Sequence, residues 1–451
     1  MNIYQVNSYI NITIYDFILV PLLFILFIYF AKASKSYKSM SLELQKAYIT
    51  GLYLKLFATL AFCLVHMTAY GGDTHAYFRE MLRLKDIASQ DIGGYLKVLW
   101  NGYNSGTYHI FEKVGHPMRS FIDTKTYFVP RLLSPFSFIG FNSFIVTSLL
   151  ISRFFYTGIW RLFKVFYQEF PDKIKIIKWA VLFTPSVLFW GSGILKDSVC
   201  LAAIGFFIFA FHQAFLQRKP SLSTIITLIV STYIIVSIKP YIFVAILPGS
   251  LLWLSFGTLK KIKSRFVKIL SFPLIVLLSY LLFTFIFSSF DSQLGQYGSI
   301  DTMLSKAKIT KDDHTRSAAY SENYYDVGEL DGTLGGTLSK APQSIVAGLY
   351  RPFIWEARNP FILMSGLENF VLLLITFWMF FKTGFFKIFK TIFNTPLLFF
   401  CLFFSIFFAF SVGLATANFG ALVRLRTPML PFFVYLLLHL NSLGKEKKVE
   451  K

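Results

Sequence analysis

The chain has 451 residues, of which 55% are hydrophobic and 54 are Phe. This composition excludes an ordinary soluble globular protein, because such a protein cannot bury so much apolar surface. The formal net charge of +21 would suit a nucleic-acid partner, but the positions of the charges predict a membrane topology and no nucleic-acid partner.

Apolar stretches long enough to cross a bilayer recur along the whole chain. Lipid offers no partner for a backbone N–H or C=O, so each of them is expected to be a helix. The expected fold is therefore all-α, a single polytopic integral membrane domain over residues 1–451 with about eleven transmembrane helices. The predicted spans are 14–31, 47–70, 137–160, 178–195, 199–217, 222–238, 241–258, 269–289, 362–381, 396–414 and 427–441.

The basic residues predict the orientation. If the N-terminus lies outside, alternate connections fall on the cytoplasmic side together with the C-terminus. These inner segments hold 23 of the 44 Lys and Arg but only five of the 23 acids, as the positive-inside rule requires. They are 32–46, 161–178, 218–219, 260–268, 382–390 and 445–451.

Two long segments fall on the outer, periplasmic side, at 71–136 and 290–361. Loops of this length commonly carry function or their own structure. In the first, the apolar spacing over 77–90 predicts an amphipathic helix on the membrane surface. The second holds a similar piece at 301–309, and its Gly-rich stretch at 326–343 predicts either a mobile lid or a loose connection.

The first outer segment opens with the motif "GGDTHAYFRE". Gly71 and Gly72 are expected to end the second span in a left-handed conformation, which leaves Asp73 at the membrane interface. His75 and Tyr77 follow within the same turn or two and are grouped with Asp73 as substrate-binding candidates. The alternative reading is that Asp73 merely caps the helix that follows.

Cationic residues recur at the same predicted depth. Lys196 and Asp197 lie at the tip of the hairpin "PSVLFWGSGILKDS", and Lys239 ends a span just before Pro240. Outer turns need polar residues, the Gly-Ser-Gly run permits close packing, and interfacial lysines extend toward water, so a structural reading of each remains open.

Three arginines also lie on the predicted outer side, against the overall charge bias. Arg351 stands in "GLYRPFIWE", and Arg424 and Arg426 stand in "GALVRLRTPMLP" before the last span. Arginine facing lipid is costly, so these side chains are expected to face a polar cavity. Their planar guanidinium groups suit a phosphate, while attraction to lipid headgroups is the alternative.

An acid and several cations at one rim predict a specific reaction. A carboxylate within hydrogen-bond reach of an acceptor hydroxyl can act as its general base. Cations can stabilise a departing phosphate or diphosphate in a site of low dielectric constant. Together they predict glycosyl transfer from a polyprenyl-phosphate-linked sugar to a glycan, lipid or protein acceptor, with Asp73 as base.

At this point the chain resembles the GT-C superfamily of integral-membrane glycosyltransferases. The resemblance rests on the many spans, the early acidic motif, the stretch "PSVLFWGSGILKDS" and the late element "RLRTPMLP". It implies Asp73 as base, Lys196 and Asp197 near the site, and Arg424 and Arg426 on the donor phosphate. It also implies a multi-pass protein of the bacterial cytoplasmic membrane.

Two other functions remain open. The chain is also similar to polysaccharide polymerases and O-antigen ligases, in which case Arg316, Arg351 and Arg358 of the second outer loop would do the work. A lipid-linked glycan flippase or other transporter would instead use charges within spans, such as Lys55 and Glu368. No required metal or cofactor is predicted, and the three Cys are read as small buried hydrophobes.

Overall fold

The computed structural model describes residues 10–261, 324–329 and 333–446, together with scattered positions between 264 and 311. Across this described part the regular structure is helical, and the one β-type pairing is an isolated antiparallel bridge between Tyr324 and Asn418. The predicted all-α class is therefore confirmed. The predicted span at 269–289 and the predicted amphipathic piece at 301–309 fall mostly outside the described residues, and Arg316 falls outside them entirely.

Within the described ranges, six helices are long and apolar enough to cross a membrane, which identifies a helical membrane protein. A seventh is added if the pair 124–139 and 144–169, which is bent by 112°, is counted as one span. The helices 222–238 and 240–256 are apolar but shorter. The six are Ile14–Ala33, Leu42–Tyr70, Lys196–Leu216, Pro360–Thr383, Pro396–Ala415 and Phe419–Gly444.

The chain divides into two compact units, and each is described by itself. The first comprises Met1–Leu162 and Val187–Phe206, and the second comprises Phe163–Ser186 and Phe207–Lys451. Helices α8 (Phe144–Glu169), α10 (Pro185–Trp190) and α11 (Lys196–Phe211) contribute residues to both.

In the first unit, the long apolar helices α1, α3 and α11 accompany a group of shorter helices in the segment 73–139. Gly158 of α8 and Gly205 of α11 bring these two helices into close backbone contact, since a Cβ on Gly205 would lie 2.1 Å from the Gly158 carbonyl oxygen. The elements are α1 (Ile14–Ala33), α2 (Lys35–Lys38), α3 (Leu42–Val65), η3 (His66–Tyr70), α4 (Asp73–Gln90), α5 (Ile92–Asn101), η4 (Tyr108–Phe111), η5 (Arg119–Ile122), α6 (Thr124–Leu133), α7 (Pro135–Ile139) and α11 (Lys196–Phe211).

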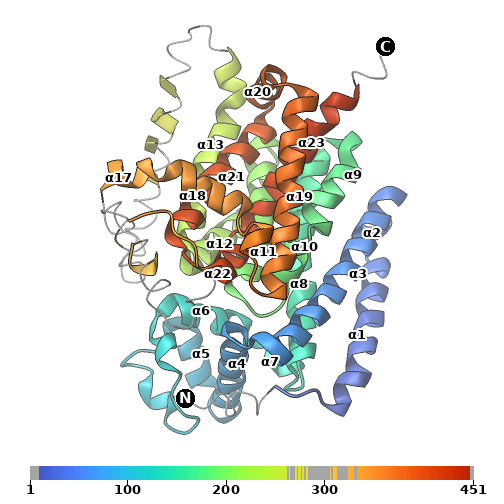
Figure 1. The fold of residues 1–451 in the computed structure, drawn as a ribbon. Helices are drawn as coiled ribbons and strands as arrows, with labels where there is room; N and C mark the ends of the chain where they lie inside the picture. Colours follow the sequence, from blue (N-terminus) through green and yellow to red (C-terminus); the bar gives the residue numbers. More distant parts are fainter. Residues whose placement is uncertain are drawn as a thin grey trace. The chain divides into compact units, whose positions relative to one another are not determined.

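Helix α4 is the centre of the first long loop and packs against α5, α6 and α7, which lie around it in Figure 1. Phe78, Met81, Leu84 and Ile87 are buried on it at helical spacing. The predicted helix over 77–90 is present as part of α4. Its apolar face was expected on the membrane surface, but in this structure that face is covered by protein.

In the second unit, α19, α21 and α23 run side by side, and α18 crosses close to α21 (Figure 1). The close approach depends on two glycines, because a Cβ on Gly348 would lie 2.2 Å from the Ala409 carbonyl oxygen and one on Gly413 would lie 2.0 Å from that of Ser344. The elements are η6 (Pro171–Lys173), α9 (Ile174–Ile177), η7 (Lys178–Phe183), η8 (His212–Leu216), α12 (Leu222–Ile238), α13 (Pro240–Lys261), α17 (Leu334–Ser339), α18 (Ala341–Tyr350), η10 (Ile354–Glu356), α19 (Pro360–Thr383), α20 (Phe385–Asn394), α21 (Pro396–Ala415), α22 (Phe419–Leu425), η11 (Thr427–Met429) and α23 (Leu430–Glu446).

Two stretches differ in detail from the sequence-based expectation. The predicted span 178–195 consists of η7 and α10, separated at Thr184, because the residue before Pro185 takes an extended ψ of 121° and interrupts the helix. Within the Gly-rich stretch 326–343, residues 334–339 form α17 and α18 begins at Ala341.

Candidate functional site

Asp73 begins α4 directly after the apolar helix α3–η3 ends. Gly71 and Gly72 have φ angles of 53° and 77°, and the Gly71 N–H donates to the His66 carbonyl oxygen at 2.9 Å. The predicted glycine stop is therefore confirmed. Gly72 is the N-cap, and Asp73 is the first helical residue, where the helix dipole favours a carboxylate. Its side chain is exposed.

Beneath Asp73, α4 buries an unusual number of polar groups. Thr74 and Glu80 are fully buried and His75 is 4% exposed. Among the described residues, none makes a hydrogen bond of good geometry to the Thr74 hydroxyl, to either His75 ring nitrogen or to the Glu80 Oε2 atom. The nearby backbone of His66 and of Met118 still acts on His75 and Glu80 respectively. Buried groups of this kind are costly unless water or a ligand satisfies them. Burial lowers the pKa of the His75 imidazole; the His66 backbone opposes this shift, and the charge of Arg79 adds to it.

Glu80 is the most deeply placed acid of this segment. Its Oε1 atom pairs with the Arg83 guanidinium one turn later. Burial raises the pKa of the Glu80 carboxyl, and the Arg83 and Arg79 charges oppose that rise without cancelling it. The sequence showed Glu80 inside the motif but gave it no role, and the only available signal was the Glu–Arg pair at helical spacing.

Tyr77 belongs to the packed core of the loop. Its ring is 3% exposed and meets the Phe121 ring edge-on at 6.0 Å, and the Phe121 ring meets that of Tyr127 at 5.6 Å. This burial makes Tyr77 a support for α4, so direct contact with a substrate is not what its surroundings favour.

Lys196 is a cation in the same unit as Asp73. It begins α11, and its ammonium donates to the Thr126 hydroxyl at 2.8 Å on the first turn of α6. The Thr126 N–H in turn donates to the Asp123 carboxylate at 3.0 Å. Burial would raise the pKa of Asp123, but the Thr126 hydrogen bonds and the Lys196 charge outweigh it and the pKa is lowered. Asp197 is buried beside Lys196.

The hairpin that carries Lys196 is held against α3 by its glycines. A Cβ on Gly193 would lie 2.2 Å from the Phe62 ring, and one on Gly191 would lie 3.3 Å from the Lys55 ammonium. The Lys55 ammonium also donates to the Gly191 carbonyl oxygen. Close packing therefore accounts for the small residues of the hairpin.

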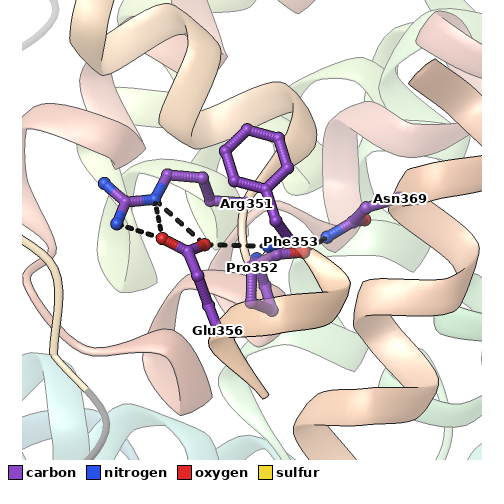
Figure 2. Close-up of polar contacts among 5 residues, drawn as sticks. All are labelled: Arg351, Pro352, Phe353, Glu356 and Asn369. Carbon is purple, nitrogen blue, oxygen red and sulfur yellow. Dashed lines mark hydrogen bonds and ion pairs between the residues drawn. The ribbon is translucent and has the colours of Figure 1, made fainter.

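Arg351, in the second unit, has its charge matched by nearby protein groups. Its Nε atom lies 2.9 Å from Glu356 Oε1 and 3.2 Å from Oε2, and its Nη2 atom also bonds to this carboxylate (Figure 2). The guanidinium lies 4.9 Å from the Tyr325 ring centroid and 5.4 Å from that of Phe419, within cation–π range. Burial raises the pKa of the Tyr325 phenol, and the Arg351 charge opposes that rise.

Arg426 is fully buried and ties the segment around Arg351 to α19. Its Nη1 atom donates to the carbonyl oxygens of Arg351 at 3.0 Å and Leu349 at 3.4 Å, and its Nη2 atom donates to Asn369 Oδ1. Asn369 donates from its Nδ2 atom to the Pro352 carbonyl oxygen at 2.9 Å, so the amide bridges the same turn (Figure 2).

A buried carboxylate stands next in sequence to that asparagine. Glu368 Oε2 accepts from the Ser186 N–H at 2.8 Å and from its hydroxyl at 2.9 Å, and Arg426 and Glu368 attract each other electrostatically. The sequence predicts no role for Asn369 or Glu356. Their only signals are one amide within an apolar span and one acid five residues after Arg351.

The two remaining cations differ in exposure. Arg424 lies in the last turn of α22 and is half-buried. Lys239 is buried as the C-cap of α12, directly before α13 begins at Pro240. The prediction that the late arginines avoid lipid agrees with the full burial of Arg426, although its two terminal nitrogens donate to protein acceptors.

The candidates thus fall into two groups within separate units. Asp73, His75, Tyr77, Lys196 and Asp197 belong to the first unit, and Lys239, Arg351, Arg424 and Arg426 belong to the second. Over the described residues, no cluster of three His, Cys, Asp or Glu has the arrangement needed to hold a metal ion. No family model, curated protein or solved structure matches the chain.

Proposed function

We propose that the protein is a membrane glycosyltransferase. It moves a sugar from a polyprenyl-phosphate-linked donor to a hydroxyl acceptor at the outer face of a bacterial cytoplasmic membrane. In this reaction the acceptor oxygen bonds to the anomeric carbon, the bond from that carbon to the phosphate oxygen breaks, and the acceptor proton passes to a carboxylate. The proposed class remains the GT-C type that the sequence motifs resemble.

The observation that carries the proposal is the position of Asp73. Its carboxylate is exposed on the first turn of α4, where a membrane-length apolar helix has just ended. A lipid-linked donor and a polar acceptor meet at such a depth, and an exposed carboxylate there is able to take a proton from the acceptor. Glu80, by contrast, is enclosed and paired with Arg83, which suits a supporting role.

The contacts of the cations refine their proposed roles. Arg426 and Arg351 already bond to protein acceptors, so we assign them to positioning the turn at residues 349–352. Lys196 shares its unit with Asp73 and lies at the start of α11, where it donates to Thr126, so we assign it to the donor phosphate. We also propose the N-out topology and the eleven spans. The six long apolar helices are joined in this count by the bent pair at 124–169, the stretch 178–195, α12, α13 and residues 269–289.

A transporter would need ionisable groups inside the membrane that are available to a cargo. Lys55 and Glu368, the charges that favoured this reading, bond to the Gly191 carbonyl oxygen and to Ser186 respectively. These contacts favour the enzyme over the transporter.

The test is transfer by purified protein in detergent, with a polyprenyl-phosphate sugar and a mixture of candidate acceptors. Because a micelle has no inside and outside, product formation requires an enzyme. A donor carrying a single sugar that is consumed once per turnover supports the proposal, whereas use of donors carrying whole repeat units alone indicates a polymerase. Movement of donor across vesicles without any product in detergent would refute the proposal in favour of transport.

A further inference from the structure

Helix α20 connects two membrane-length helices and has three distinct faces. It spans Phe385–Asn394, and it follows α19 and precedes α21, both of which are candidate spans. At ten residues it is too short to cross a bilayer. It must therefore lie where α19 leaves the membrane and α21 enters it.

One face of α20 packs on the protein. Ile388 and Ile392, one turn apart, are each 2% exposed, and α20 contacts α19 and α21. This contact fixes the rotation of the helix about its axis, so the directions of its other two faces follow from the helical period.

The second face is aromatic and uncovered. Phe386 is 88% exposed, Phe385 58% and Phe393 56%. The Phe385 and Phe389 rings lie 4.4 Å apart and extend this face along the helix. So many exposed rings on one short helix are unfavourable in water but favourable in hydrocarbon.

The third face is polar and basic. Lys387 donates from its Nζ atom to the Leu443 carbonyl oxygen at 3.1 Å near the end of α23, and the Lys390 side chain is exposed. The stretch 382–390 contains three Lys and no acid. With 100° per residue, Lys390 falls on the side of the helix opposite the protein-packed isoleucines and next to the aromatic face. Lys387 lies between Lys390 and the packed face, where it reaches the end of α23.

We propose that α20 is an in-plane membrane helix whose phenylalanines enter the acyl chains and whose Lys390, aided by Lys387, binds the phosphate of an anionic phospholipid. We choose a lipid as the partner because one helix presents aromatic rings, which partition into hydrocarbon, beside ammonium groups, which bind phosphate. A bilayer interface offers acyl chains and phosphate headgroups at the same depth. The proposal does not depend on the glycosyltransferase assignment.

The test uses full-length protein in vesicles that contain equal parts of phosphatidylcholine and phosphatidylglycerol. The three native cysteines, all buried, are replaced by alanine, and a bimane fluorophore is attached to Phe393→Cys or to Lys390→Cys. At position 393 we expect strong quenching by acyl-chain-brominated lipid and weak quenching by aqueous iodide, with the reverse order at position 390. Stronger quenching by iodide than by brominated lipid at position 393 would overturn the membrane placement.

Headgroup selectivity is read at the same fluorophore. Brominated phosphatidylglycerol should quench position 393 more effectively than brominated phosphatidylcholine. Lys390→Gln should reduce this preference about five-fold, the effect typical of one lysine near an anionic surface. The matched control is Lys97→Gln in α5, an exposed lysine in the first unit that carries the same charge change. If Lys390→Gln and Lys97→Gln both keep the preference for brominated phosphatidylglycerol, or both lose it equally, the lipid-phosphate contact is refuted.

Discussion

Replacing Arg426 with Gln should destabilise the protein strongly, and the structure gives the scale. The guanidinium is fully buried and donates to the Arg351 and Leu349 carbonyl oxygens and to Asn369. Hydrogen bonds between membrane-embedded side chains contribute about 0.6 kcal/mol each on average. Breaking a buried charged network in a soluble protein costs about 3–5 kcal/mol. Three bonds therefore predict a loss of roughly 2–5 kcal/mol in the free energy of unfolding.

The assay is unfolding by sodium dodecyl sulfate in mixed micelles, followed by circular dichroism. Arg424→Gln, a half-buried arginine two residues away, is the matched control and should lose less than about 1 kcal/mol. Asn369→Leu combined with Arg426→Gln should cost less than the sum of the single changes, because each removes the same bond. An Arg426→Gln protein as stable as the parent, with weakened donor binding, would refute the positioning role and return Arg426 to the donor phosphate.

Two further predictions concern the first unit. Gly193→Ala should lower the unfolding midpoint far more than Gly115→Ala. Both residues have a positive φ, but only at Gly193 would a Cβ clash with a neighbour, the Phe62 ring 2.2 Å away. Equal losses in the two variants would contradict this clash. Glu80→Gln should change the pH dependence of stability. The pKa of Glu80 is raised above its ordinary value of 4.5, so its stabilising contribution is present below pH 4.5 and is lost as pH rises through the folded-state pKa. Unfolding titrations across that range should show the loss in the parent and not in Glu80→Gln, and identical pH profiles would argue against it.

Local chemistry made some features predictable from sequence. The paired glycines at 71–72 predicted where α3–η3 ends, and the spacing of Phe78 and Met81 predicted helix α4. Both signals act over a few residues, where turn preferences and helical period decide the outcome. Arg426 was expected to face a polar cavity because a lipid-exposed guanidinium is costly, and the structure buries it on protein acceptors.

The partners of these residues were not predictable, because they are distant in sequence. Asn369 is 57 positions from Arg426, and no short-range pattern marks it as the acceptor. Hydropathy alone also does not show where an apolar stretch is interrupted. The stretch 178–195 was therefore predicted as one span, although it is divided at Pro185 into η7 and α10. The sequence predicts a basic connection over 382–390 where the structure has α20, because windows of span length dilute a ten-residue amphipathic pattern.

The most direct test of the proposed mechanism compares two substitutions in α4. Asp73→Asn and Asp86→Asn remove the same charge from exposed positions of one helix. Asp73 also interacts with the helix dipole, so the unfolding midpoint of each variant is measured beside its activity. With purified protein, polyprenyl-phosphate sugar and acceptor in detergent, Asp73→Asn should lower kcat by about 10²–10⁴-fold while Asp86→Asn leaves it unchanged. If Asp73→Asn retains full kcat, Asp73 is not the base and the mechanism fails.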